Sequence, residues 1–197
     1  MDAYELITTR RSTRKYSDIL PERELIDKVI EAGRYAPSGS NSQTTHLMVF
    51  TDRGVLDELA VLVQREFAEM ELTDDMYVSL KASINASKKG TYRFHYDAPV
   101  LIVTANKAGY GNAIADSACV LENMMIAANA LDLGSCWINQ LHWLDEHEKI
   151  RDFLSRFGLL ENETVTGGLI LGYPEGGLPD RRMTDRKGNP VTWAERE

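Results

Sequence analysis

Residues 99–105, Pro-Val-Leu-Ile-Val-Thr-Ala, constrain the fold most strongly because they form a continuous apolar run of strand length. The run carries no charge and is rich in β-branched residues, which is typical of a buried strand. A strand of this kind needs other elements packed around it, so the segments before and after it decide the fold class.

The rest of the chain predicts helices and strands in mixed order. Further strands are expected at 47–51, 136–138 and 164–172, and helices at 3–9, 21–35, 55–70, about 74–89, 114–133 and 145–157. The helix at 114–133 is expected to end with Gly134 as its C-cap. Because strands and helices do not alternate strictly, the order favours an α+β fold over a doubly wound one. The chain lacks a linker segment, so residues 1–197 are expected to form one domain.

Composition and charge narrow the function classes. The chain is 43% hydrophobic and 26% charged, as in ordinary globular proteins, and its net charge of −8 argues against binding nucleic acid or an anionic membrane surface. It has neither an apolar run of about 18 residues nor the pattern of a signal peptide at its N-terminus. The two cysteines form no CxxC pair, so a cytoplasmic protein is expected.

The basic residues concentrate in two clusters. They are Arg10, Arg11, Arg14 and Lys15 around Ser12, and Arg181, Arg182, Arg186 and Lys187 near the other end. Guanidinium forks beside a hydroxyl match the geometry of a phosphate monoester. The alternative is a solvated basic surface that pairs with the abundant carboxylates, and charge alone favours that alternative.

A polar loop of small residues occupies positions 37–43, Pro-Ser-Gly-Ser-Asn-Ser-Gln. Small residues let a ligand approach the backbone, and the Ser, Asn and Gln side chains offer both donors and acceptors to the edge of a planar heterocycle. The alternative is a turn whose side chains bond their own backbone, and the loop taken alone favours the turn.

Several familiar sites are not predicted. Residues 109–114 follow a strand and precede a helix, but Ile114 stands where a dinucleotide-binding turn needs a small residue. The chain has no phosphate-binding GxxxxGK[ST] motif, and its four histidines lack metal-ligand spacing. No arrangement points to covalent catalysis by Ser or Cys.

The order of the short motifs carries more information than any one of them. They are Arg10-Arg11-Ser12-Thr13-Arg14-Lys15-Tyr16, Ala36-Pro37-Ser38 with Asn41 and Gln43, Asp97-Ala98-Pro99, Asp116-Ser117-Ala118, Leu133-Gly134-Ser135-Cys136-Trp137-Ile138, and Gly172-Tyr173-Pro174 followed by Arg186-Lys187. In this order and spacing the chain resembles the nitroreductase family from end to end.

The resemblance implies an α+β fold with a mixed central sheet flanked by helices, and an intertwined homodimer with two FMN sites at its interface. It assigns the FMN phosphate and ribityl chain to Arg10, Ser12 and Arg14, with Arg11 beside them and Arg186 and Lys187 reaching the same phosphate. The loop residues Pro37, Ser38, Ser40, Asn41 and Gln43 would line the flavin from the partner subunit. Cys136, Ile138 and Asn139 would pass the ring near N5 with backbone contacts.

By the same resemblance the chain transfers electrons from NAD(P)H to a nitroaromatic, quinone or similar small acceptor. The flavin carries this chemistry, so no catalytic side chain is expected. The alternatives are a flavin- or nucleotide-binding module without turnover, or a specialised enzyme of the same fold. The chain departs from the family where Thr44-Thr45 replaces the usual Pro-Trp, and it offers no clear flavin contacts between residues 82 and 89.

Overall fold

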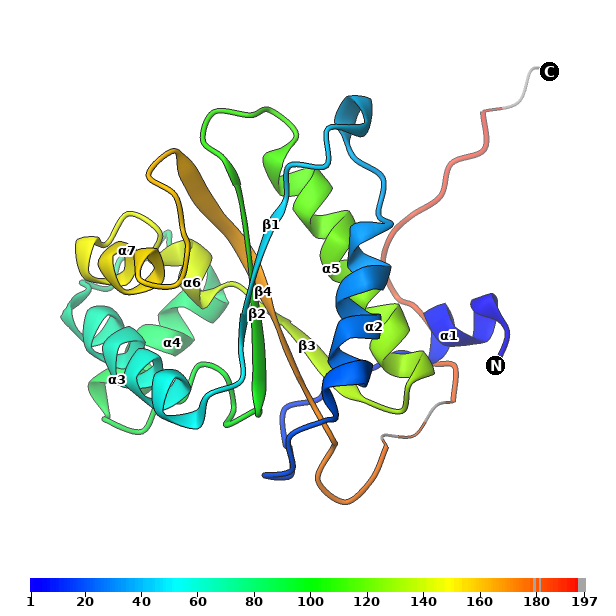
Figure 1. The fold of residues 1–197 in the computed structure, drawn as a ribbon, viewed down its shortest axis with the longest axis horizontal. Coiled ribbons are helices and arrows are strands. Elements are labelled where there is room, and N and C mark those ends of the chain that lie inside the picture. Colours follow the sequence, from blue (N-terminus) through cyan, green and yellow to red (C-terminus); the bar gives the residue numbers. More distant parts are fainter. Residues whose placement is uncertain (179, 181, 195–197) are drawn as a thin grey trace.

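Figure 1 shows the fold in a computed structural model, which describes residues 1–178, 180 and 182–194. The helices are α1 (Ala3–Thr9), α2 (Arg23–Arg34), the short 3-10 helix η1 (Gly39–Asn41), α3 (Arg53–Glu69), α4 (Val78–Lys88), α5 (Ala113–Ala130), α6 (Gln140–Trp143) and α7 (Glu148–Ser155). The strands are β1 (His46–Phe50), β2 (Val100–Lys107), β3 (Gly134–Ile138) and β4 (Glu163–Gly172). The α+β prediction is confirmed.

The four strands form one sheet in the order β1-β2-β4-β3, and each neighbouring pair is antiparallel. Among the described residues, parallel pairing is limited to an isolated bridge between Ser12 and Ser135. Strand β2, the apolar run of the sequence, lies between β1 and β4, and its residues from Val100 to Asn106 are buried. The segment therefore forms the centre of the sheet, as its composition predicts.

Helices cover both faces of the sheet (Figure 1). On one face, α2 and α5 enclose a core that includes Val100 and Ile102 of β2. On the other face, α3, α4, α6 and α7 enclose a second core that includes Leu101 and Val103. Alternate residues of one strand thus enter opposite cores, because successive side chains of a strand point to opposite faces.

The prediction that Gly134 caps the long helix is wrong. Helix α5 ends at Ala130, and Asp132 takes the left-handed conformation with φ 59°. Gly134 instead begins β3, where a Cβ atom would lie 2.7 Å from Thr13 Oγ1 and 2.9 Å from Pro174 Cγ. Its missing side chain serves close packing against two other segments rather than a helix end.

The helix expected at 145–157 begins three residues later, at Glu148. Asp145 lies before it and has another role. Its carboxylate accepts hydrogen bonds from the Val165 backbone N–H at 2.8 Å and from Arg151 Nη1 at 3.0 Å. The side chain therefore ties this corner to β4 instead of starting a helix.

Within the described residues, no helix is long and apolar enough to cross a membrane.

After β4 the described tail residues form no helix or strand from 182 to 194, and Figure 1 shows this segment passing α1 and extending away from the sheet. Its apolar residues Val191 and Trp193 are 77% and 81% exposed.

Candidate functional site

The first basic cluster lies along the outer edge of strand β3. The Thr13 backbone N–H donates to Ser135 O at 2.9 Å beside the Ser12–Ser135 bridge, and the Tyr16 hydroxyl donates to Thr13 O at 2.7 Å. These bonds hold the segment extended against the strand. Arg10, Ser12 and Arg14 are therefore brought next to Cys136, as the sequence predicts for one half of the site.

The same residues set the electrostatics around Cys136. Burial raises the pKa of the Cys136 thiol, while the positive charges of Arg14 and Arg10 and a hydrogen bond with Ser12 act in the opposite direction. A thiol that is mainly desolvated stays protonated near neutral pH. Cys136 is thus an uncharged residue beside the cluster, and the arginines supply the positive charge of this region.

Arg10 has unused capacity to bind an anion. Its side chain is 23% exposed, and its Nε lies 3.9 Å from Glu122 Oε1, a loose ion pair. Its Nη1 is buried and donates no hydrogen bond within the described part of the chain. Because an unpaired buried donor on a cation is unfavourable, this position favours an additional anionic partner such as a phosphate.

The C-terminal segment meets the first cluster through Arg11. The Arg11 guanidinium donates to the carbonyl oxygens of Thr8 at 3.1 Å, of Arg10 at 2.9 Å and of Arg182. A cavity of about 420 Å³ opens here, and it is lined by Arg11, Asp180, Arg182, Met183 and Thr184. The two basic clusters thus meet, but they do so through Arg182.

The other predicted members of the second cluster are placed differently. Arg186 and Lys187 are exposed and lie farther along the tail than the residues that contact Arg11. Arg181 lies outside the described residues. Their assignment to the phosphate therefore stays a prediction.

Strand β3 offers backbone groups beside this cluster. It is an edge strand, so one row of its N–H and C=O groups points away from β4. Ile138 is buried, and the Trp137 Nε1–H donates to Asn139 Oδ1 at 2.6 Å, which fixes the end of the strand. Backbone contacts from Cys136, Ile138 and Asn139 to a planar ligand fit this geometry.

The polar loop is the second half of the predicted site, and it contains strained backbone. Ser40, Asn41 and Gln43 have left-handed φ values of 53°, 54° and 50°. Non-glycine residues in this region are uncommon and collect at ligand sites. The loop is partly held by its own side chains, since the Gln43 N–H donates to Ser38 Oγ at 3.0 Å and Gln43 Nε2 donates to Asn41 Oδ1 at 3.0 Å.

Two open spaces adjoin the loop. One, of about 130 Å³, is lined by residues that include Pro37, Ser38 and Gln43, and the other, of about 310 Å³, is lined by residues that include Tyr35, Asn41 and Gln43. Ligand pockets are typically about 300–1,000 Å³, so only the second space reaches that range. Its lining residues Tyr35, Asn41 and Gln43 are exposed, so a ligand there needs a second surface to be enclosed.

The two halves contact different parts of helix α5. The loop meets Asp116 in the first turn of α5, whereas Arg10 of the basic cluster pairs with Glu122 of the same helix at 3.9 Å. At 1.5 Å per residue these positions are about 9 Å apart along the helix axis. Figure 1 shows η1 and α1 near opposite ends of α5.

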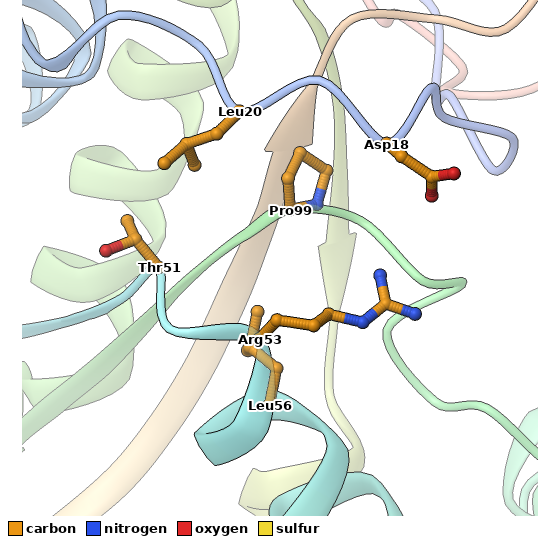
Figure 2. A pocket seen from close by; sticks show the side chains of 6 residues that line it. All are labelled: Asp18, Leu20, Thr51, Arg53, Leu56 and Pro99. Carbon is orange, nitrogen blue, oxygen red and sulfur yellow. The ribbon is translucent and has the colours of Figure 1, made fainter.

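A separate cavity of about 360 Å³ contains none of the predicted residues. It lies where β1 ends and α3 begins, and Figure 2 shows its lining of Asp18, Leu20, Thr51, Arg53, Leu56 and Pro99. The Arg53 guanidinium is already shared between Asp57 and Asp97 at 3.3 Å and 3.5 Å. The basic cluster, with its unpaired cationic donor, is therefore the stronger candidate for an anionic cofactor.

Sequence reasoning missed two residues that hold the loop, Asp116 and Tyr110. Asp116 belongs to a motif of the resemblance, but no role is predicted for it. Nothing in the local pattern around Tyr110 indicates that its hydroxyl contacts Ser42 and Gly39, 68 and 71 positions earlier.

Comparisons with known proteins identify the family and the fold. A sequence model described as the nitroreductase family matches residues 7–173. A nitrobenzene nitroreductase from Ectopseudomonas oleovorans is 26% identical, and the match covers 93% of this chain and 91% of that protein. A crystal structure of a nitroreductase with bound FMN from Bacteroides fragilis is 32% identical with a TM-score of 0.84, covering 98% of this chain and 99% of the other. A BluB-like flavoprotein from Clostridium difficile 630, 24% identical with a TM-score of 0.72 and covering 99% and 100% of the two chains, shares the fold.

Proposed function

The chain belongs to the nitroreductase family, and we propose that it is an FMN-dependent enzyme that carries electrons from NAD(P)H to a nitroaromatic, a quinone or a similar small acceptor. The observation that carries the proposal is the meeting of Arg10, Ser12 and Arg14 with the edge of β3, where one guanidinium nitrogen is buried without a partner among the described residues. The FMN-bound relative from Bacteroides fragilis supports the choice of cofactor.

The side chains present are of the types that bind a phosphate and a ribityl chain. Arg10, Arg14 and the Ser12 hydroxyl would hold the phosphate and ribityl chain, and Arg11 would keep the C-terminal segment beside them through the Arg182 carbonyl. The outer edge of β3 would face the ring with backbone groups. FMN, when bound, supplies the hydride chemistry. The chain's own work is to bind, to orient and to exclude water.

The protein is proposed to act as a homodimer in which the loop of one copy lines the flavin held by the other. This assignment is supported by the spaces beside the loop, whose lining residues Asn41 and Gln43 are exposed in the single copy. Each half presents ligand-type groups, and neither forms an enclosed site alone. Two copies would form two complete sites.

The donor and the acceptor are proposed to use one pocket in turn. The segment 109–114 lacks the pattern of a dinucleotide-binding turn, so the nicotinamide would stack directly on the flavin and exclude the acceptor. Double-reciprocal plots at several acceptor concentrations should therefore be parallel. Intersecting lines would show a ternary complex and a second site.

An anaerobic titration tests the function directly. The purified protein should be yellow and should release FMN, not FAD, on denaturation. NAD(P)H should bleach the flavin absorbance, and a quinone or nitroaromatic should restore it. A colourless protein that ignores added FMN would refute the proposal, whereas bound FMN that NAD(P)H does not reduce would identify a binding module.

A further inference from the structure

The loop at residues 38–43 is held from outside by a buried carboxylate. Asp116 is 6% exposed, and its two oxygens lie 3.0 Å and 3.2 Å from the Gly39 backbone nitrogen, which donates to them. Asp116 Oδ2 also accepts from the Tyr110 hydroxyl at 3.0 Å. One carboxylate in the first turn of α5 thus joins the loop to the β2–α5 connection.

The directions of these hydrogen bonds follow from their chemistry. The Tyr110 hydroxyl lies 3.0 Å from Asp116 Oδ2 and 3.4 Å from the Gly39 carbonyl oxygen, and both of these oxygens only accept, so its single proton goes to the closer, charged one. The Ser42 hydroxyl, 3.2 Å from the Tyr110 oxygen, must then be the donor in that pair. Loop residues at both ends of η1 therefore donate into the pair formed by Asp116 and Tyr110, which we call the Asp116 clamp.

The clamp acts on the part of the loop that most needs support. Between Gly39 and Gln43, Ser40 and Asn41 adopt left-handed φ values. Such residues persist only where surrounding contacts impose them, since each is unfavourable by about 1–3 kcal/mol. The fit is also close, because a Cβ atom at Gly39 would lie 2.6 Å from the Tyr110 hydroxyl oxygen.

We infer that Asp116 is a positioning residue for cofactor binding, which acts through Gly39 and Ser42 to hold the loop in the conformation that lines the flavin. The inference rests on the proposed function, because the loop has a ligand to line only if FMN binds. Asp116 itself touches no ligand in this account. Its effect is on the fraction of molecules whose loop is already in the binding conformation, and that fraction scales the apparent FMN affinity.

The test compares Asp116→Asn and Tyr110→Phe with a matched control, Tyr77→Phe, whose side chain is exposed and which directly precedes α4 as its N-cap residue. FMN affinity is measured by flavin fluorescence titration, and amide hydrogen exchange of residues 37–44 is measured on FMN-free protein. Asp116→Asn should weaken FMN binding by roughly tenfold or more, the loss of one charge-assisted bond. Tyr110→Phe should weaken it severalfold, and both should speed loop exchange. Tyr77→Phe should change neither quantity.

Two results would overturn the inference while leaving the proposed function intact. One is wild-type FMN affinity in both clamp variants. The other is faster loop exchange without any loss of affinity, which would make the clamp a local stability feature. Failure of the wild-type protein to bind FMN is a different result, since it would refute the proposed function itself. Should Asp116→Asn fail to fold, Tyr110→Phe carries the test, because it keeps the ring and removes only the hydroxyl.

Discussion

The two halves of the candidate site are built in opposite ways. The Arg10–Arg14 segment is extended and is fixed by backbone pairing with β3, where the Thr13 N–H meets Ser135 O at 2.9 Å. The loop at 37–43 pairs with no strand in the described structure, has three left-handed residues, and is held by side chains such as Asp116. The first half supplies positive charge from a segment that backbone hydrogen bonds hold in place. The second half supplies a loop conformation that includes strained backbone. Substitutions in the Arg10–Arg14 segment should therefore mainly remove contacts to FMN. Substitutions in the loop should mainly lower the fraction of molecules whose loop is already in the binding conformation.

The largest effect is expected from Arg10→Ala. It should weaken FMN binding by about 1.5–3 kcal/mol because it removes a charge-assisted contact to the phosphate. The matched control is Arg23→Ala, since Arg23 is exposed on α2 and pairs with Asp27 on the same helix. Flavin fluorescence titration measures both variants, and equal losses in the two would show that the cluster is not an anion site.

A second segment with left-handed backbone lies next to a buried residue, unlike the exposed loop. Tyr96 and Asp97 are also left-handed, but they follow His95, which is 0% exposed and has no hydrogen bond to either ring nitrogen from the described residues. Burial, and then the nearby Arg93 charge, lower the pKa of His95 from 6.5 to about 4. Because the folded pKa lies below the unfolded one, the contribution of neutral His95 to stability is fully present above pH 6.5 and is lost as the pH falls toward 4.

The expected loss is about 2 kcal/mol of unfolding free energy between pH 7.5 and pH 5, relative to a His95→Leu variant. Urea unfolding of the two proteins at both pH values gives the difference, which cancels the contribution of other titrating groups. Parallel pH profiles would show that the neutral state of His95 is not favoured by folding.

A smaller effect is expected from Ser38→Ala in the loop. The change removes the hydroxyl that accepts the Gln43 N–H at 3.0 Å, a neutral hydrogen bond of about 0.5–1.5 kcal/mol. FMN binding should weaken by less than with Arg10→Ala, and the unfolding temperature of the FMN-free protein should fall by no more than about 4 °C. A loss equal to that of Arg10→Ala would reverse the assigned roles of the two halves.

The sequence predicts what short-range patterns can encode. The apolar run of β2 predicts its central place, and the motif order predicts the fold and the position of the first basic cluster. The clamp was not predictable because Asp116 and Gly39 are 77 positions apart, and side-chain convergence over that distance leaves no local signal. The ends of α5 and α7 were misplaced for a related reason, since tertiary contacts of Gly134 and Asp145 decide them.

Mixed dimers test the central claim, that the basic cluster and the loop of one flavin site come from different copies. One dimer pairs an Arg10→Ala copy with an Asn41→Ala/Gln43→Ala copy. The other pairs a wild-type copy with a copy carrying all three substitutions. At an FMN concentration that fills the wild-type dimer only, the first dimer should bind one FMN and the second none, because only the first keeps one site with both halves intact. The reverse pattern, none in the first and one in the second, would place both halves of each site in the same chain and contradict the account.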